Sequence, residues 1–416
     1  MSDLNAYIVT LARAAKKASI GLRTLSADAK NAALRAMAES IDARRPAIRA
    51  ANAKDVERGK KSDLSAAMVD RLTLTEKRID EIIASLRDVA ALEDPVGEII
   101  GVRRPGGFVL EKVRTPIGVI AMIYESRPNV PVDAAALCLK SGNAAILRGG
   151  SEALESSRVL VECIREALAR VGVDGNAVQY VERTEHEAID HLVKQNGLID
   201  LVIPRGRESL IRRVTENATV PVIKHYKGVC HMYVDETADL FMAAEVVTNS
   251  KVQRPGTCNA LEKLLVEQSV AERFLPMVRE KMPTVEFRGD ERVRAILPGT
   301  KLATEEEWYE EYLDLILTVK VVKNLEEAAA HIEKYGSSHT DGICSSDSRN
   351  IERFVSLVDS AVVMVNASTR LNDGGIFGLG AEMGISTDKL HARGPMGPKE
   401  LTTYKWVLRG NGDIRK

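Results

Sequence analysis

Apolar residues recur at helical spacing through the first part of the chain. Residues 4–92 are rich in alanine, and within them Ala33, Leu34, Met37 and Ile41 fall on one face of a helix. This pattern predicts that the amino-terminal region is a group of helices.

Two pairs of residues have the spacing of a capping box, in which each side chain satisfies a free backbone donor beside the other residue. They are Thr73 with Glu76 and Thr184 with Glu187. The first pair predicts a helix that begins there and runs to about Leu92. The second predicts the start of a shorter helix.

Strand patterns begin after residue 102. A turn rich in arginine, proline and glycine occupies 103–107, and residues 108–113 then alternate with a period of two, as in an exposed strand or hairpin arm. The next run, 117–124, is nearly all apolar, which is typical of a strand covered on both faces in a parallel sheet. Alternation continues through helix 132–139, strand 144–148, helix 151–171, strand 177–181, the helix after Thr184 and strand 199–203. It predicts a doubly wound parallel sheet that binds ligands at the carboxyl ends of its strands.

A second alternating region follows and predicts another sheet domain. Its elements are strand 230–234, helix 238–248, strand 261–266, strand 315–322, helix 325–335, strand 342–344, helix 349–358 and strand 361–365. Residues 366–384 are then rich in glycine and too long for a simple connection, so we expect them to be functional. The terminal run 401–408, which contains Tyr404 and Trp406, is a strand that we expect to complete the arm begun at 108–113.

Composition narrows the class of protein. The chain has 416 residues, of which 45% are hydrophobic, so two or three domains are expected. Lysine and arginine total 58 against 59 acidic residues, so no excess of positive charge favours nucleic acid. No apolar run approaches membrane-spanning length, and charged residues interrupt the first 25 residues, which argues against a signal peptide. The same charge balance favours a small-molecule partner. Five scattered cysteines without paired spacing indicate a reducing compartment, hence a cytoplasmic protein.

Cys258 stands out from the other cysteines. It follows a turn at Pro255 and Gly256 and precedes the apolar strand 261–266. A thiol at the junction of a turn and a strand is exposed at the end of a sheet while its backbone is held rigid, as a nucleophile requires. The other cysteines, at 138, 163, 230 and 344, lie within apolar patterns and are expected in the core.

The loops that follow the first strands are candidates for phosphate binding. They span 125–129, 148–152 and 204–208, and each carries a cation or a glycine, including Gly206. The second and third lead into helix amino termini, where free amides favour an anion. The common dinucleotide fingerprint and the phosphate loop ending in glycine and lysine are both missing, so a nucleotide would be held by another arrangement.

Five segments in order over some 280 residues resemble one family. They are 116–129 ending in Tyr-Glu-Ser-Arg-Pro-Asn, 140–152 with Gly-Asn-Ala-Ala-Ile-Leu-Arg-Gly-Gly-Ser-Glu, 252–262 with Gln-Arg-Pro-Gly-Thr-Cys-Asn-Ala-Leu-Glu, 366–382 with Ala-Ser-Thr-Arg and Phe-Gly-Leu-Gly-Ala-Glu, and 391–396 with His-Ala-Arg-Gly-Pro-Met. Together they are similar to the gamma-glutamyl phosphate reductase branch of the aldehyde dehydrogenase superfamily.

The resemblance implies an α/β fold, with two doubly wound parallel-sheet domains and a β oligomerisation arm. The nucleotide-binding domain would comprise 1–102, 117–227 and 366–395, the catalytic cysteine domain 228–365, and the arm 103–116 with 396–416. It further implies reduction of L-glutamyl 5-phosphate by NADPH to glutamate 5-semialdehyde, the second step of proline synthesis from glutamate. A homo-oligomer is expected, and glutamate 5-kinase is a candidate partner.

The same resemblance assigns roles in the reaction. Cys258 matches the family nucleophile, and Asn129 matches the asparagine whose amide would form the oxyanion hole with the Cys258 backbone. These roles suit the chemistry, because attack of a thiolate on an acyl carbon creates an oxyanion that needs fixed donors. We expect Ser368 and Arg370, with Arg127, to hold the amino-acid end of the substrate.

Cofactor residues follow from the resemblance with two departures. Arg148 stands where most of the superfamily has a lysine at the adenosine ribose, and Ser151 follows one residue later than usual. An arginine there is a bidentate donor suited to the ribose phosphate, which favours NADP over NAD. Glu311 matches the glutamate that holds the nicotinamide ribose, although the usual Phe-Gly-Pro is absent after it. Gly206 is the fourth expected cofactor contact.

Two other features bear on the chemistry. The stretch 225–230 matches the segment in which hydrolytic aldehyde dehydrogenases carry a water-activating glutamate, and it contains no carboxylate. Lys227 and His225 are candidates to lie near an incoming anion instead. His225 and His231 match no common metal-binding spacing, so no metal site is expected.

Two alternative classes of function stay open at the level of sequence. One is a cofactor-free thiol hydrolase or acyltransferase that uses Cys258 with a histidine base, which would need no nicotinamide for turnover. The other is a catalytically silent member that serves only as an assembly partner.

Overall fold

A computed structural model describes residues 3–62, 64–105, 108–125 and 127–415. The chain forms two compact units, the first comprising Met1–Lys224, Gly378–Gly384 and Met396–Lys416, and the second His225–Phe377 with Ile385–Pro395. These bounds differ from the three parts expected above, because the arm lies with the first unit and residues 225–227 lie with the second, as does the segment 366–377 with 385–395. Hydrogen bonds hold part of this segment there: Asn259 Nδ2 donates to the Asn372 carbonyl at 2.8 Å, and the Thr369 amide donates to Ser250 Oγ at 3.1 Å.

The first unit is built on a four-stranded sheet in the order β5-β4-β3-β6. The strands are β3 (Val119–Tyr124), β4 (Ala144–Arg148), β5 (Val178–Tyr180) and β6 (Leu201–Arg205), and every pairing is parallel. All six residues of β3 are buried, which confirms that its apolar run is covered on both faces.

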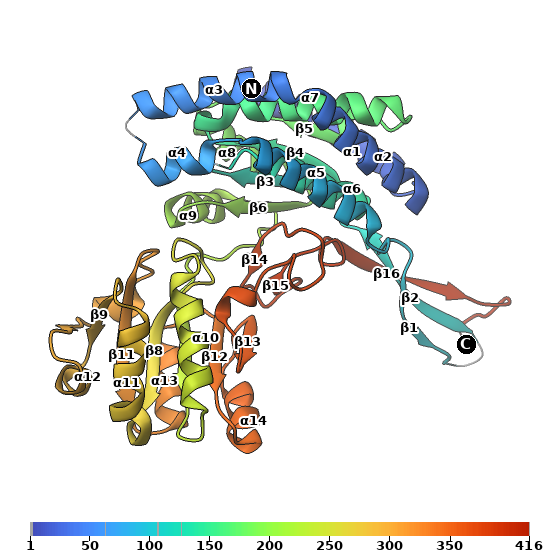
Figure 1. Ribbon diagram of the computed structural model, residues 1–416. Helices are drawn as coiled ribbons and strands as arrows, with labels where there is room; N and C mark the ends of the chain where they lie inside the picture. The colour runs from blue at the N-terminus through green and yellow to red at the C-terminus, as the bar shows by residue number, and fades with distance from the viewer. Residues whose placement is uncertain (1–2, 63, 106–107, 126, 416) are drawn as a thin grey trace. The chain divides into compact units, whose positions relative to one another are not determined.

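Helices pack around this sheet (Figure 1). α1 (Asp3–Leu22) and α8 (Glu187–Leu192) contact one another, as do α6 (Val130–Lys140) and α7 (Leu154–Arg170), while α9 (Glu208–Asn217) contacts β6. A short 3-10 helix, η1 (Ser151–Ala153), precedes α7. Three more helices add a layer next to α6 and α7: α2 (Ala27–Ala43), α3 (Arg45–Lys61) and α5 (Glu76–Ala91), with α4 (Ala66–Leu72) joined to α3. The expected amino-terminal helices are therefore present.

Both expected capping boxes are wrong. α5 begins after Thr75, whose hydroxyl accepts from the Arg78 amide, while the Thr73 hydroxyl donates to the Val69 carbonyl at the end of α4. α8 begins after His186 without a side-chain cap, and Thr184 lies too far from the first turn to reach it. A cap works only from the residue immediately before the helix, and spacing alone did not locate that residue.

The second unit contains a seven-stranded sheet in the order β10-β9-β11-β8-β7-β12-β13. Every pairing in it is parallel. The strands are β7 (Cys230–Val234), β8 (Leu261–Glu267), β9 (Glu286–Gly289), β10 (Lys301–Leu302), β11 (Ile316–Val322), β12 (Thr340–Cys344) and β13 (Val362–Val365). The sequence predicted five of these strands to within about two residues, whereas β9 and β10 lie in a stretch that gave no strand pattern.

Successive residues of these strands face two separate cores. Met232 and Val234 of β7 belong to a core with α10 (Leu240–Val252), α11 (Gln268–Lys281) and α12 (Glu291–Ile296). Tyr233 between them belongs to a second core with α13 (Leu325–Tyr335) and α14 (Ser348–Leu357). Helices therefore cover both faces of the sheet, as a doubly wound fold requires. The fold class expected from the sequence is confirmed.

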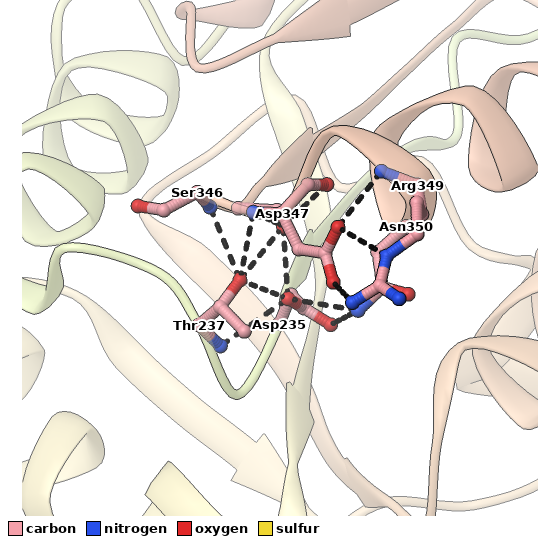
Figure 2. Close-up of polar contacts among 7 residues, drawn as sticks. Asp235, Thr237, Ser346, Asp347, Arg349 and Asn350 are labelled. Atoms are coloured by element: carbon pink, nitrogen blue, oxygen red, sulfur yellow. Dashed lines mark hydrogen bonds and ion pairs between the residues drawn. The ribbon is translucent and has the colours of Figure 1, made fainter.

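A network of hydrogen bonds occupies the carboxyl ends of β7 and β12 (Figure 2). The buried carboxylate of Asp235 accepts from the Thr237 hydroxyl at 2.6 Å, the Ser345 hydroxyl at 2.8 Å and the Asn350 amide at 3.1 Å. Thr237 Oγ1 also accepts from the Asp347 amide at 3.1 Å. Because these groups satisfy one another, this edge of the sheet presents a structural network at the place where doubly wound folds usually bind ligands.

An antiparallel arm of three strands extends from the first unit, in the order β1-β2-β16 (Figure 1). β2 (Val109–Pro116) pairs with β16 (Thr402–Arg409) in regular register, as expected for residues 108–113 and 401–408. β1 (Ile99–Arg103) was not expected, and its register with β2 shifts between Ile99 and Gly101. Gly106 and Gly107 of the expected turn lie outside the described residues.

A two-stranded ribbon, β14 (Ile385–Ser386) with β15 (Gly394–Pro395), lies in the second unit.

Candidate active site

Cys258 lies at the amino edge of the second sheet. It precedes β8 by three residues, while His225 and Gly228 precede β7, and His339 directly precedes β12. Strands β8, β7 and β12 are neighbours and all parallel, so the segments that lead into them meet at one edge. The site is therefore built from chain entering the sheet, at the end opposite to the Asp235 network.

Two histidines flank the thiol. The sulfur of Cys258 and one ring nitrogen each from His225 and His339 all lie within 4.8 Å of one another, and the two rings meet edge to face with centroids 5.1 Å apart. Cys258 is partly exposed, whereas His339 is fully buried. This arrangement places two potential cations beside a single accessible thiol.

The histidines make Cys258 unusually acidic. Burial of the thiol opposes its ionisation, but the electrostatic influence of His339 and His225 outweighs that effect and holds the pKa of Cys258 well below its ordinary value. Burial raises the pKa of the other four cysteines. Cys258 is thus the one thiol poised as a thiolate among cysteines that the structure describes, and thiolates are the nucleophilic form.

Glu311 is tied to the same edge. Its Oε1 accepts from the Gly228 amide at 2.9 Å, and burial, with the nearby Cys258 charge, raises the pKa of Glu311 to about 7. The two residues after Glu311 are also held in place. The backbone amides of Tyr312 and Leu313 donate to the carboxylate of the fully buried Glu262 at 3.3 Å each. Glu311 is therefore a positioned carboxyl group and not a solvated surface charge.

Arg370 lies next to the Cys258 loop. Its guanidinium donates to Gln253 Oε1 at 2.9 Å and hydrogen-bonds Asn259 Oδ1 beside the nucleophile. Ser368 is buried, and its hydroxyl accepts from the Ser250 hydroxyl at 3.1 Å and from the Arg370 amide at 3.2 Å. The structure thus brings Cys258, Glu311 and Arg370 to one edge of the second unit, while the Ser368 hydroxyl serves the turn that positions Arg370.

The remaining expected site residues belong to the first unit. Asn129 immediately precedes α6, and its Nδ2 donates to Asp133 Oδ2 at 2.8 Å. Arg127 is exposed two residues before it. Ser151 opens η1, and Gly206 lies in the loop after β6, where a side chain would meet the Glu125 carboxylate at 2.6 Å. Arg148 ends β4.

Comparison with known proteins identifies the family. The model of the aldehyde dehydrogenase family matches residues 5–300. A gamma-glutamyl phosphate reductase of Geotalea daltonii is 52% identical over 98% of both chains, and one of Thermodesulfovibrio yellowstonii is 55% identical over 88% of both. The crystal structure of the gamma-glutamyl phosphate reductase of Thermotoga maritima, 47% identical, superposes with a TM-score of 0.96 over 98% of this chain and 100% of that one.

The chain belongs to the gamma-glutamyl phosphate reductases of the aldehyde dehydrogenase family. It is therefore an oxidoreductase, and membership of the aldehyde dehydrogenase family implies a nicotinamide cofactor. An acetylating aldehyde dehydrogenase of Geobacillus thermoglucosidasius, 17% identical with a TM-score of 0.72 over 100% of both chains, shows the same fold. Across the described residues, no helix has both the length and the apolar character needed to cross a membrane.

The first unit of this reductase has groups that suit a nucleotide phosphate. Arg148 and Arg205 end β4 and β6, the strands on either side of β3. Arg148 Nε and Arg205 Nη1 are buried and have no hydrogen-bond partner in the described structure. The other Arg148 donors bind the Gly149 and Thr184 carbonyls at 3.0 Å each, so its guanidinium is held against the backbone and is not the freely presented fork expected from the sequence.

Two histidines of this reductase contribute more to the site than the sequence indicates. The sequence makes His225 a candidate neighbour of an incoming anion and gives it, with His231, no metal-binding spacing, while it assigns no role to His339. Each stands shortly before a strand of the second sheet, which is the same signal that singled out Cys258. By contrast His231 is buried in the core, where its Nδ1 lies 3.2 Å from Asp341 Oδ1. The four cysteines expected in the core are buried, as predicted.

Gly228 of this reductase permits the close approach of two loops. A Cβ at this position would lie 1.8 Å from the Cys258 carbonyl oxygen and 2.8 Å from its Cα, both backbone atoms. Only glycine fits there without displacing the nucleophile. We predict that Gly228→Ala shifts the Cys258 backbone by about 1 Å and lowers kcat on the order of 100-fold, since that displacement is enough to misalign a reacting group.

The matched control for this substitution is Gly21→Ala. Gly21 lies in α1 with nothing within 4 Å of its added Cβ, so its activity should stay at the level of the unsubstituted enzyme. Steady-state kinetics on both variants checks the prediction, with thermal unfolding to confirm that each is folded. Normal kcat in a folded Gly228→Ala enzyme would contradict the tight contact.

Proposed function

We propose that this chain reduces L-glutamyl 5-phosphate to L-glutamate 5-semialdehyde and phosphate, with NADPH as the reductant and a thioester on Cys258 as the intermediate. The relatives that resemble it over nearly their whole length carry the name of this reaction. The observation that supports the chemistry most strongly is the single low-pKa thiol set between His225 and His339. In the cell, the step would be the second of proline synthesis from glutamate.

Each residue near the thiol has a part in the proposed reaction. The Cys258 thiolate attacks the acyl carbon, the bond from that carbon to the phosphate oxygen breaks, and phosphate leaves with the electron pair. The reduced nicotinamide supplies a hydride to the thioester carbon when bound. The Cys258 sulfur then leaves as a thiolate and the aldehyde is released. His225 and His339 favour this mechanism at two points, because they stabilise the thiolate both as attacking and as leaving group.

Fixed donors are proposed for the oxyanion that forms during attack. The Cys258 backbone amide and the side-chain amide of Asn129 are the candidates, as the family resemblance implies. In the first unit the Asn129 amide is held by Asp133, a partly buried carboxyl group whose pKa burial raises to about 6. A donor fixed in advance by a neighbour stabilises developing charge without reorganising during the reaction.

We propose NADP as the cofactor, with the phosphates held at the carboxyl ends of the first sheet. The unpartnered buried donors of Arg148 and Arg205 support an anionic ligand there. Ser151 opens η1 shortly after Arg148, and Gly206 directly follows Arg205. In the second unit Glu311 is proposed to bind the nicotinamide ribose through its carboxylate oxygens. Its link to Gly228 would then couple cofactor position to the Cys258 loop.

The reverse reaction tests the proposed function directly. Semialdehyde, NADP and phosphate are mixed with enzyme, and formation of NADPH is followed by absorbance. The proposal expects a rate that requires all three components. Turnover without any nicotinamide would instead support the thiol hydrolase or acyltransferase alternative, and complete absence of turnover by folded enzyme would support a purely structural role.

Arg370 is proposed to bind a carboxylate of the substrate. Its guanidinium lies beside Asn259 and hence beside the nucleophile, and burial together with the neighbouring Arg254 charge lowers its pKa, a sign that the site favours an added anion. We predict that Arg370→Ala raises the KM for semialdehyde by about 10- to 100-fold, the value of a lost charge-assisted hydrogen bond. The KM for NADP should stay within about twofold of its normal value.

Initial-rate kinetics with each substrate varied in turn measures both constants for Arg370→Ala. Arg349→Ala is a matched control, because Arg349 is an exposed arginine of the same unit that pairs with Asp347 at the opposite edge of the sheet. A raised KM for NADP with an unchanged KM for semialdehyde would move Arg370 to the cofactor side. Arg127 and Ser368 are proposed as secondary contacts of the same substrate.

The arm is proposed to assemble copies of the chain. Its surface exposes apolar and aromatic side chains, including Tyr404, Trp406 and Leu408 at about half of their full accessibility, and its outer strands have unpaired edges within the described chain. We predict a particle larger than a monomer in sedimentation at micromolar concentration, because such a surface favours self-association. A single species of monomer mass would refute this assembly.

Two further proposals concern the setting of the enzyme. All five cysteines are free, which suits a reducing cytoplasm, and fractionation of cells with an antibody would test that location. The acyl phosphate is a labile substrate, so direct association with glutamate 5-kinase would shorten its exposure to water. Co-sedimentation of the two purified enzymes tests that partnership.

A further inference from the structure

Three side chains at the amino edge of the second sheet combine the donors that zinc prefers. Zinc is bound in proteins by cysteine sulfur and histidine nitrogen, most often in a tetrahedral arrangement. Here one cysteine and two histidines bring one donor atom each to within 4.8 Å of one another. No other group of three such residues lies this close among the described residues of the chain.

The hydrogen bonds around His225 leave the correct nitrogen available. Its Nδ1 lies 2.7 Å from the Ile385 carbonyl oxygen, which only accepts, so Nδ1 carries a hydrogen and Nε2 is the nitrogen left to bind a metal. A metal-binding histidine characteristically donates its other nitrogen to a carbonyl in this way. His225 is therefore oriented as a ligand before any ion arrives.

His339 has a buried nitrogen with no partner. Its Nδ1 lies 2.7 Å from Thr340 Oγ1, while its Nε2 is buried and makes no hydrogen bond in the described structure. The whole side chain has no exposed surface. A buried polar atom without a partner is uncommon in folded proteins, and this one belongs to a ring that acts on the Cys258 thiol, so a metal ion shared with that sulfur would satisfy it.

We propose that Cys258, His225 and His339 bind a zinc ion and that this ion blocks the catalytic thiol reversibly. The Cys258 sulfur donates an electron pair to the ion, and where the thiol is protonated its proton passes to solvent. The two histidines donate through their ring nitrogens. With the ion bound, the Nδ1 hydrogen of His339 would point to Thr340 Oγ1, which also accepts from the Asn372 amide at 2.6 Å. No oxidation or reduction takes place, and a solvent molecule fills the fourth position.

The geometry requires only a small closure. At ordinary zinc bond lengths the donor atoms of one ion lie roughly 3.5 Å apart, so a cluster that spans up to 4.8 Å must contract by about 1 Å. Cys258 is only partly buried and lies in a turn, so a small rotation of its side chain can supply this closure while His225 keeps its bond to the Ile385 carbonyl. His339 is held by its surroundings and serves as the fixed ligand.

Inhibition by this ion rests on the proposed function, whereas binding does not. A bound metal occupies the sulfur electron pair that would attack the acyl carbon, so turnover should fall with metal occupancy and return when a chelator is added. Substrate that already occupies Cys258 as a thioester should protect it. The site therefore offers the cell a way to set reductase activity by the level of available zinc.

Titration with Cd²⁺ alone tests the site without any substrate. Cd²⁺ bound to a thiolate gives an ultraviolet charge-transfer band, and competition with Zn²⁺ then yields the zinc affinity. We expect the band to saturate at one Cd²⁺ per chain and to be absent in Cys258→Ala. His225→Ala and His339→Ala should each weaken binding by at least about 100-fold, because even loss of an outer partner of a ligand typically costs 10- to 100-fold.

The matched control is His186→Ala, which removes an exposed histidine of the first unit and should leave the affinity unchanged. Circular dichroism confirms folding, and His225→Ala carries the test alone if His339→Ala does not fold. Affinity within about threefold of normal in a folded His225→Ala protein would reduce the site to a lone thiol and overturn the proposal. Normal phosphate-dependent turnover without metal binding would overturn only this inference, and metal binding without turnover would overturn only the proposed function.

Discussion

Cys258→Ala is expected to abolish reduction while leaving the fold intact. Loss of the nucleophile removes the covalent route altogether, and removal of a nucleophile of this kind costs on the order of 10⁴-fold or more in kcat. Cys258 is partly exposed in a turn, so its replacement by alanine opens no cavity in the core. Rapid-mixing or steady-state absorbance of NADPH measures the loss, and circular dichroism checks the fold.

Cys344→Ala is the matched control for this substitution. Cys344 is buried in the core of the second sheet and its pKa is raised to about 12, so it neither reaches substrate nor ionises at neutral pH. Activity of the control should be nearly normal. Mass spectrometry after brief exposure to iodoacetamide should find the label on Cys258 before any other cysteine. More than a trace of turnover in folded Cys258→Ala would end the assignment of the nucleophile.

Transfer of the acyl group to phosphate is expected to exceed transfer to water by a wide margin. The stretch 225–230 contains no carboxylate to activate water. A positioned general base contributes typically 100- to 10,000-fold, and phosphate, which is already an anionic nucleophile, does not depend on one. Oxidation of semialdehyde by NADP should therefore slow by about that factor when phosphate is omitted.

Glu311 is the carboxyl group that most directly challenges this prediction. It lies against Gly228 with its pKa raised to about 7, a value suited to a general base near neutral pH. If phosphate is omitted and the rate does not fall, hydrolysis is competent and the chain behaves as an ordinary aldehyde dehydrogenase. If Glu311→Gln then loses this phosphate-independent rate, Glu311 is the general base that activates water. The control is Glu310→Gln, which changes the exposed carboxylate next to it.

Residues with a strong local pattern were predictable from the sequence. The apolar run of β3 and the strand-helix alternation around β7 predicted strands with nearly the correct bounds. A strand that is buried on both faces needs apolar residues along its length, and the sequence shows them directly. Cys258 was found because proline, glycine and a strand surround it. The family resemblance then supplied Asn129 and Glu311, which no local pattern would have selected.

His339 shows why the rest of the site escaped prediction. It lies 81 positions from Cys258 along the chain, and the two meet only because β8, β7 and β12 are adjacent in the sheet. Strand order is a property of the folded chain and has no local signal in the sequence. The expectation that ligands bind at carboxyl ends also pointed away from His339, which precedes its strand. Arg148 escaped for another reason, since a strand-end arginine can bind backbone carbonyls as readily as a phosphate.

The unequal edges of the arm bear on the symmetry of any assembly. β16 pairs with β2 over eight residues in unbroken register, whereas the five-residue β1 shifts register beside Ile99. A bulged short strand is a poor template for another strand, so β1 resists further pairing while β16 permits it. Two arms joined through β16 around a two-fold axis use the same edge of each copy and leave none that can propagate. Such an assembly closes on itself instead of growing into a fibre, and its mass in the sedimentation experiment should stay fixed as concentration rises.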